Sequence, residues 1–146
     1  MIYWLTGQPG SGKTTIAKSM LRRVSNFGTL LHIDGDDIRD LFDNKDYSEN
    51  GRRKNVELAQ QIAEYLNSKQ IDVVVSLVSP YKDQRDKFKK KMGKNLTEVY
   101  VHTSEIRGKE DFFVSGYEKP DSEYIDIDTT SIGVNECVDK IFVKKL

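Results

Sequence analysis

The stretch GQPGSGKTT, residues 7–15, decides the fold of this chain. It follows an apolar run of strand length, IYWLT, and it precedes a segment with helical patterning. Residues 7–14 match G-x-x-x-x-G-K-[ST] in full, and the strand before and the helix after are the context that this motif requires. Such a loop wraps its backbone N–H groups around a phosphate at the positive end of a helix. The sequence therefore predicts a P-loop.

The motif also predicts which atoms meet a bound nucleoside triphosphate. Lys13 is expected to bridge the β- and γ-phosphates, and the hydroxyl of Thr14 to ligate Mg²⁺. The alternative is a glycine-rich turn whose lysine points to water. The full set of nucleotide contacts is expected to come from Gly7, Gln8, Pro9, Gly10, Ser11, Gly12, Lys13, Thr14 and Thr15.

Apolar runs of strand length alternate with amphipathic helical patterns along the rest of the chain. This order predicts an α/β fold of three layers, the P-loop NTPase fold of nucleoside kinases, with a central parallel sheet of about five strands that binds ligands beyond its carboxyl ends. The third run is the most continuous in β-branched residues, so it is expected to be the central strand. Strands are expected at 2–6, 29–33, 71–78, 98–102 and 124–127, and helices at 13–24, 37–42, 52–67, 82–91 and 134–142.

Composition limits the classes of protein to consider. The length of 146 residues suits one domain, 1–146, and 23 basic residues balance 23 acidic ones, so no overall charge favours nucleic acid or an anionic membrane. The apolar runs are too short to span a bilayer and Met1 leads directly into a strand, so a cytoplasmic protein is expected. Cys137 lies on the apolar stripe of the last helical pattern, as a core residue does. His32 and His102 have no second ligand at metal spacing, which favours hydrogen-bonding roles over zinc.

The segment HIDGDDIR, residues 32–39, places three carboxylates and an arginine after the second strand. The third strand ends VVSLVSPY without an acid, so Asp34 and Asp36 are expected to take over the acidic role at the site. They could order Mg²⁺ through water or accept a proton from a hydroxyl nucleophile, and the second role suggests a kinase. Capping of the short helix is the alternative, and it is the preferred role for Asp37.

A second set of polar residues opens the long helix. Arg52 and Asn55 are three residues apart and share one face, while Arg39 follows Asp36 by about one helical turn. Arginines near an acidic site suit a substrate that carries phosphate or another anion. A solvated helix face is an equally open alternative.

Five segments, in this order and spacing, resemble adenylylsulfate kinase: GQPGSGKTT, DGDDIR, YSENGRRKN, SPYKDQR and GYEKP. The resemblance covers residues 2 to about 128, and the second, third and fourth segments together are specific to that family. It implies an ATP-dependent, Mg²⁺-requiring kinase that phosphorylates the 3′-hydroxyl of adenosine 5′-phosphosulfate (APS) to give PAPS and ADP. The implied partners are ATP and a small anionic nucleotide, with APS favoured, and neither nucleic acid nor membrane. The sequence does not decide the oligomeric state, and a homodimer is one possibility.

The resemblance also implies roles for single residues. Asp36 would orient the reacting hydroxyl, and Asp34 would support the metal through water. Tyr47 replaces a phenylalanine that stacks on the substrate's adenine, and it keeps the aromatic face. For Tyr81 and for Arg85, the arginine that follows, packing and a surface charge are the alternatives. The implied substrate contacts are Asp36, Arg39, Tyr47, Arg52, Asn55, Ser79, Pro80, Tyr81, Phe112 and Phe113.

The segment after the fourth strand departs from the family pattern. A lid is expected at about 104–122, but it is much shorter than the family's lid. IRGKEDF is either the near half of that lid, with its arginine and Lys-Gly pair, or the far half, in which Phe112 or Phe113 supplies the second aromatic wall. The second alignment keeps the distance to Tyr117 and is preferred, and Arg107 or Lys109 would then replace the lid lysine. Lids exclude water and complete the charge clamp, so this loss concerns rate and substrate choice more than fold.

Two other functions stay open on this evidence. One is the same kinase chemistry on another nucleotide, for instance a cytidine diphosphate derivative used in polysaccharide modification. The other is a nucleotide-binding regulator that has lost turnover. One set of residues argues against the regulator, because each would be free to change in a protein that only binds: Lys13, Thr14, Asp36, Arg39, Arg52 and Asn55.

Overall fold

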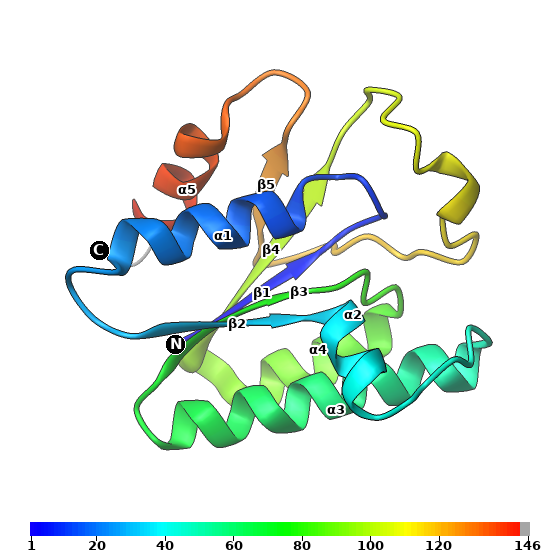
Figure 1. Ribbon diagram of the computed structural model, residues 1–146, viewed down its shortest axis with the longest axis horizontal. Helices are drawn as coiled ribbons and strands as arrows, with labels where there is room; N and C mark the ends of the chain where they lie inside the picture. The colour runs from blue at the N-terminus through cyan, green and yellow to red at the C-terminus, as the bar shows by residue number, and fades with distance from the viewer. Residues whose placement is uncertain (144–146) are drawn as a thin grey trace.

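The computed structural model describes residues 1–143, and a parallel sheet of five strands runs through them in the order β2-β3-β1-β4-β5. Figure 1 shows that all the strands point toward the same end of the molecule, so their carboxyl ends meet there. This arrangement confirms the predicted α/β fold with its parallel sheet. The strands are β1 (Ile2–Thr6), β2 (Leu30–Asp34), β3 (Asp72–Ser76), β4 (Leu96–His102) and β5 (Ile125–Asp128).

The central strand is β1, so the prediction that the third strand would be central is wrong by one position. Every residue of β1 is buried, and four of the five residues of β3, its neighbour, are buried as well. Continuous apolar sequence marks a strand that is covered on both faces, and two adjacent inner strands both satisfy that condition. The order between them is set by the crossover connections, which the apolar pattern does not record.

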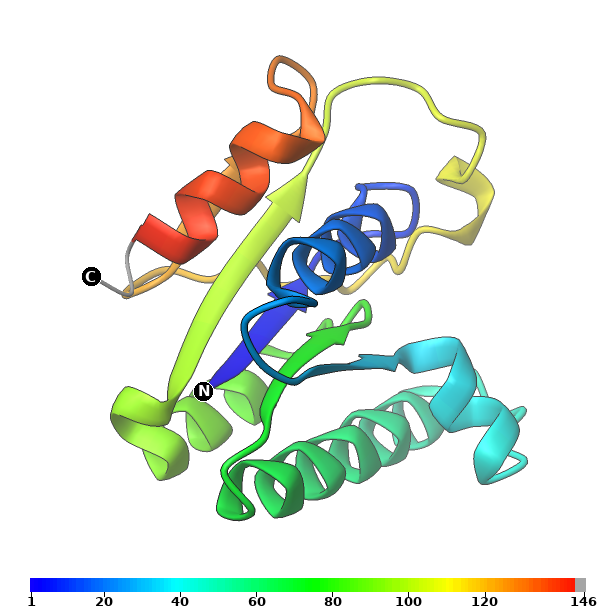
Figure 2. The same ribbon diagram turned by 60° about the vertical axis from the view of Figure 1, so that its left-hand side comes forward.

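Helices cover both faces of the sheet, as Figures 1 and 2 show. Tyr3 and Leu5 pack against α1 and α5, in the same core cluster as Cys137, whereas Ile2 and Trp4 belong to the cluster that includes α2, α3 and α4. The period-2 alternation of β1 therefore separates two cores. The helices are α1 (Lys13–Val24), α2 (Gly35–Leu41), α3 (Glu49–Ser68), α4 (Lys82–Met92) and α5 (Val134–Val143), with 3₁₀ turns η1 (Gly93–Asn95) and η2 (Glu110–Phe112). None of these helices is both long and apolar enough to cross a membrane.

Two helix starts differ from the prediction because of their caps. The helix α2 begins at Gly35, since the carboxylate of Asp34 accepts a hydrogen bond of 3.0 Å from the backbone N–H of Asp36. The cap is therefore Asp34, and the capping role expected for Asp37 is wrong. The helix α3 begins at Glu49, where the hydroxyl of Ser48 accepts from the N–H of Gly51. Polar side chains at these starts satisfy N–H groups that a helix leaves unpaired.

Candidate active site

The P-loop joins β1 to α1 in a conformation that its glycines allow. Gly10 and Gly12 have φ angles of +81° and +111°, which lie in the region that residues with a Cβ rarely adopt. Gly12 is also the N-cap of α1 and offers no side chain to the first turn. The N–H groups of that turn are consequently available to an anion, at the positive end of the helix dipole.

The side chain of Lys13 folds back over its own loop. Its Nζ donates to the carbonyl oxygens of Gly7 and Gln8, at 2.8 and 2.9 Å. Burial lowers the pKa of Lys13 to about 8, against the opposing pull of Asp34 and Asp36. The two carboxylates are thus close enough to interact electrostatically with the lysine.

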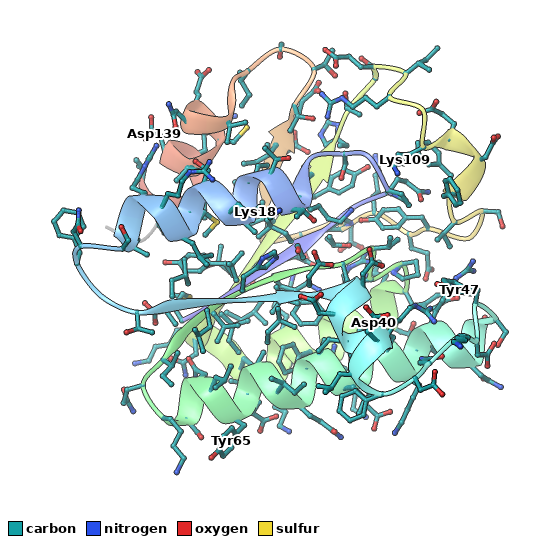
Figure 3. All side chains as sticks on the ribbon, in the orientation of Figure 1. Lys18, Asp40, Tyr47, Tyr65, Lys109 and Asp139 are labelled. Carbon is teal, nitrogen blue, oxygen red and sulfur yellow. The ribbon has the colours of Figure 1, made fainter. Side chains whose placement is uncertain are left out.

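A pocket of about 870 Å³ lies in front of the P-loop, at the carboxyl ends of the strands. Its walls come from four parts of the chain: the P-loop, the α2 and α3 region, the loop after β3, and the lid. Figure 3 labels Lys109 on the lid and Tyr47 on the α2–α3 connection, and both belong to the lining. Of the predicted site residues, the pocket brings together Pro9, Gly10, Gly12, Lys13, Thr14, Thr15, Asp34, Asp36, Arg39, Tyr47, Arg52, Asn55, Ser79, Pro80, Phe112 and Phe113.

Three predicted residues of the loop, Gly7, Gln8 and Ser11, lie outside that lining. Tyr81 is outside it as well: its ring is buried beside the N-terminus of α4, with the guanidinium of Arg53 at 4.3 Å from the ring centroid. The position of Tyr81 fits the packing alternative, and a substrate contact of this residue stays a prediction.

The acidic side of the pocket offers oxygen ligands to a metal. Thr14, Asp34 and Asp36 all line the same cavity, and hydroxyl and carboxylate oxygens are the ligands that Mg²⁺ accepts. Within residues 1–143 no group of three or more His, Cys, Asp or Glu side chains forms a metal cage. Mg²⁺ usually keeps several waters and binds through one or two protein groups plus substrate phosphates, so this sparse oxygen set fits it.

The opposite wall carries an aromatic ring and two arginines. The guanidinium of Arg39 lies 4.0 Å from the ring centroid of Tyr47 and donates to the carbonyl oxygens of Asn44 and Asp46, at 3.1 and 3.0 Å. Arg39 thereby shapes the loop that presents Tyr47, whose side chain is 63% exposed. Arg52 lines the pocket and has no side-chain hydrogen bond or ion pair with any residue from 1 to 143. The wall can therefore offer one open ring face and one uncommitted cation to a ligand.

Asn55 adds an unsatisfied group to this wall. Its Nδ2 donates to the carbonyl oxygen of Gly35 at 3.2 Å, but its Oδ1 is buried and has no partner. A buried acceptor without a donor costs about 1 to 3 kcal/mol. Since Asn55 lines the pocket, a ligand that donates a hydrogen bond would remove that cost.

The loop after β3 is held in a strained conformation. Ser79 has a φ of +47°, which is uncommon for a residue with a side chain. Trp4 donates its indole N–H to the hydroxyl of Ser79 at 3.2 Å, and Thr6 and Arg85 donate to its carbonyl oxygen at 3.1 and 2.5 Å. These contacts fix the position from which Ser79 and Pro80 face the pocket.

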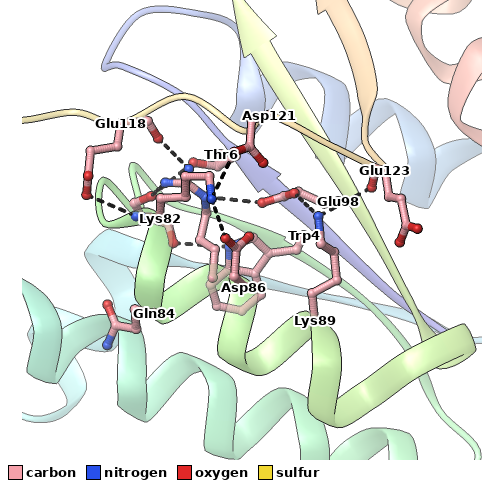
Figure 4. Close-up of polar contacts among 12 residues, drawn as sticks. Trp4, Thr6, Lys82, Gln84, Asp86, Lys89, Glu98, Glu118, Asp121 and Glu123 are labelled. Atoms are coloured by element: carbon pink, nitrogen blue, oxygen red, sulfur yellow. Dashed lines mark hydrogen bonds and ion pairs between the residues drawn. The ribbon is translucent and has the colours of Figure 1, made fainter.

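Arg85 is the centre of a buried polar network and not a surface charge. It is 3% exposed, lies 3.1 Å from the carboxylate of Glu98, and also donates to the carbonyl oxygen of Glu118. Figure 4 shows the second cation of the network, Lys89, joined to Glu98 at 2.8 Å. The network ties α4, β4 and the returning end of the lid to the Ser79 loop. A signal for it was present in the sequence, since Glu98 is a lone acid in the strand EVYVH and a buried acid needs a cationic partner.

The lid, residues 104–122, lies between β4 and β5 and reaches the P-loop. Arg107 donates to the carbonyl oxygens of Gly10 and Ser11, both at 3.2 Å, while Phe112 and Phe113 line the pocket. The short lid thus combines a feature of each proposed alignment: cations beside the P-loop and aromatic rings at the pocket rim. Sequence reasoning missed Val114 and Asp111, which also line the pocket and carry no motif.

Each histidine has a hydrogen-bond partner. The Nε2 of His32 lies 2.6 Å from the hydroxyl of Ser76, and burial lowers the pKa of this imidazole. His102 lies 3.0 Å from the carboxylate of Asp126. Neither histidine lines the pocket, so neither is a candidate for its chemistry.

The fold and the pocket define a kinase of the P-loop class, with the nucleotide loop on one side of a cavity and a second set of polar and aromatic side chains across it. The comparisons with known proteins then identify the family: a family model described as adenylylsulphate kinase matches residues 1–122, and the chain belongs to that family.

Individual relatives agree with this assignment. The adenylyl-sulfate kinase of Clostridium kluyveri is 32% identical over 97% of this chain and 81% of its own. The cytidine diphosphoramidate kinase of Campylobacter jejuni is 32% identical over 68% of this chain and 59% of its own. Among solved structures, the Mycobacterium tuberculosis APS kinase CysC in complex with AMPPNP and APS superimposes with a TM-score of 0.83 over 97% of this chain and 95% of its own, and at 20% identity this likeness concerns the fold.

Proposed function

We propose that this chain transfers the γ-phosphoryl group of ATP to the 3′-hydroxyl of APS, giving PAPS and ADP. The observation that carries the proposal is a single pocket that holds both the P-loop and the second set Asp36, Arg39, Arg52 and Asn55. Membership of the adenylylsulphate kinase family supports the choice of APS. A pure nucleotide-binding regulator would have no use for the second set.

On the donor side, the P-loop amides and Lys13 would hold the triphosphate. To do so Lys13 must exchange its bonds to the carbonyls of Gly7 and Gln8 for phosphate oxygens, and the charge of those oxygens favours its protonated form. Thr14 would hold Mg²⁺, with Asp34 assisting through water; when bound, the ion supplies charge neutralisation to the phosphates. Because the transition state is loose, positioning and electrostatic stabilisation account for most of the catalysis.

On the acceptor side, Asp36 would orient the 3′-hydroxyl and take its proton as the bond to phosphorus forms. Arg39 and Arg52 would bind the anionic part of the substrate, and Tyr47 would stack on its base, with Phe112 or Phe113 on the other side. Asn55 would accept a hydrogen bond through its unpaired oxygen. These roles keep the reactants in line, which is the main contribution of a protein to phosphoryl transfer.

A second acceptor is supported by a specific observation. The short lid leaves base recognition largely to stacking, and stacking accepts different rings. The 32% identity with the Campylobacter jejuni cytidine diphosphoramidate kinase makes a cytidine nucleotide the main competitor. The kinase chemistry would be the same, because none of the P-loop contacts depends on the acceptor's base.

A competition experiment separates the two acceptors. APS, cytidine diphosphate derivatives and AMP would be offered with MgATP, and kcat/KM would be compared. We expect APS to be preferred. A preference of more than about tenfold for a cytidine nucleotide, about 1.4 kcal/mol in transition-state binding, would reject APS and leave the kinase assignment intact. If none of the acceptors leads to ATP consumption, the nucleotide-binding regulator would be favoured. The organisation of 1–146 as one domain, the cytoplasmic location and the homodimer stay predictions.

A further inference from the structure

Gln8 makes a paired contact with the lid that phosphate binding does not require. Its amide nitrogen donates to the carbonyl oxygen of Val114, and its amide oxygen accepts from the N–H of Val114, both at 2.9 Å. The two bonds have the geometry of one step of a sheet ladder, made by a side chain instead of a strand. The P-loop motif leaves position 8 unspecified, so this side chain is free for a role other than holding phosphate.

Val114 is the point at which the lid docks on the body of the protein. Between residues 104 and 119, all of which the structure describes, it is the one buried residue. Its neighbours Phe112 and Phe113 are 68% and 45% exposed, yet they line the pocket. Their position over the pocket therefore depends more on how firmly Val114 is held than on packing of their own rings.

The lid is attached to the body of the protein on either side of Val114, and the hydrogen bonds of Gln8 hold the segment between these attachments, which carries Phe112 and Phe113. Arg107 is fixed to the carbonyls of Gly10 and Ser11, and Tyr117 shares a hydrogen bond of 2.9 Å with the hydroxyl of Thr6. Between these two attachments, Gln8 provides the side-chain hydrogen bonds from outside the lid to residues 108–116. Without it, residues 108–116 would keep the burial of Val114 but would have no side-chain hydrogen bond to the described chain outside the lid.

We propose that Gln8 is a positioning residue: it holds Val114, and through it the Phe112–Phe113 wall, closed over the acceptor part of the pocket. This inference rests on the proposed function for the identity of the acceptor, but not for the contact itself. Closure places an aromatic face against the acceptor and keeps water from the γ-phosphate. A second consequence follows: a protein with a loosened wall should transfer more phosphoryl groups to water.

The test uses two variants of Gln8 and one matched control in the full-length protein. Gln8→Leu removes both hydrogen bonds at similar volume, and Gln8→Glu keeps the acceptor for the N–H of Val114 but loses the donor. Gln60→Leu is the control, because Gln60 is also partly buried and donates to a backbone carbonyl, that of Gln84, and neither of these residues lines the pocket. The readouts are amide hydrogen exchange at Val114 by NMR, KM and kcat for APS, and ATP hydrolysis with MgATP and no acceptor.

We expect Gln8→Leu to expose the Val114 amide to exchange, to raise KM for APS about tenfold with kcat changed less than about threefold, and to increase hydrolysis relative to transfer. Gln8→Glu should be intermediate, and Gln60→Leu should match the wild type in all three. If the Val114 amide exchanges at the wild-type rate in Gln8→Leu, the Gln8–Val114 contact is overturned. If the amide exchanges faster but KM for APS and ATP hydrolysis stay unaltered, the positioning role is overturned. If the wild-type protein does not use APS at all, the proposed function fails, while exchange and acceptor-free hydrolysis still decide on Gln8.

Discussion

The two sides of the pocket are built in different ways. On the strand side, Lys13 and Ser79 are buried and held by several hydrogen bonds each, and the Arg85 network behind them is buried too. On the lid side, Ile106 and Phe112 are exposed, and the segment is attached through a few polar contacts. The difference indicates that the loops of the strand side hold their conformation before a ligand arrives, although the Lys13 amine must still move from carbonyls to phosphate, whereas the surface that selects the acceptor has little packing to fix it.

The largest expected effect tests whether the strand side is rigid because of its buried network. Arg85→Ala should lower the free energy of unfolding by about 3 to 5 kcal/mol, because it leaves a buried carboxylate with one cation fewer and removes one of the two donors to the Ser79 carbonyl. Denaturant unfolding measures this. The matched control is Arg53→Ala, whose ion pairs with Glu49 and Asp83 are near the surface and should be worth less than about 1 kcal/mol. Equal losses in the two variants would contradict the comparison.

The next effect concerns rate rather than stability. Lys13→Ala should reduce phosphoryl transfer about a hundredfold or more, a loss of about 3 kcal/mol in transition-state stabilisation. Its circular dichroism spectrum should match that of the wild type, since the glycine backbone of the loop persists. Turnover near that of the wild type would contradict the assignment of the P-loop.

The pH dependence of the kinetics tests the environment of Lys13 on the strand side of the pocket. Lys13 in the free protein has a pKa of about 8 because of burial, so it is charged below pH 8 and loses its charge as the pH rises through that value. We expect kcat/KM for MgATP to fall about tenfold between pH 7 and 9, because this parameter reports the free protein. At saturating MgATP the phosphates stabilise the charged lysine, so kcat should keep its value to higher pH. A fall of both parameters at the same pH would assign the titration to another group.

The smallest effect is expected on the lid side. Phe112→Ala should raise KM for the acceptor about fivefold, the equivalent of about 1 kcal/mol at the low end of base stacking. Because the ring is exposed, the free energy of unfolding should change by less than about 0.5 kcal/mol. Steady-state kinetics and urea unfolding measure the two quantities. A clear loss of stability would show that the lid is packed more firmly than its exposure indicates.

Sequence reasoning located the P-loop and the alternation of strands and helices because both are local patterns. The helix that starts at Lys13 was predicted with both of its ends correct. What failed or was missed depends on contacts between distant segments: the central place of β1, the Gln8–Val114 pair and the reach of Arg107 to Gly10. The cap at Asp34 is a local contact, and it was missed because a carboxylate suits both a cap and a metal. The extended backbone of Asp34 and its bond to the N–H of Asp36 identify it as the cap.

The buried state of Cys137 has a practical consequence for spectroscopy. It is the only cysteine in the sequence, it lies in the core between α5 and the sheet, and burial raises the pKa of its thiol. Thiol-directed dyes react with the thiolate, so the native cysteine should remain unlabelled in the folded protein. A single Lys109→Cys substitution would then carry a fluorophore at the pocket rim without removal of the native residue. Its emission would report the lid in real time during turnover.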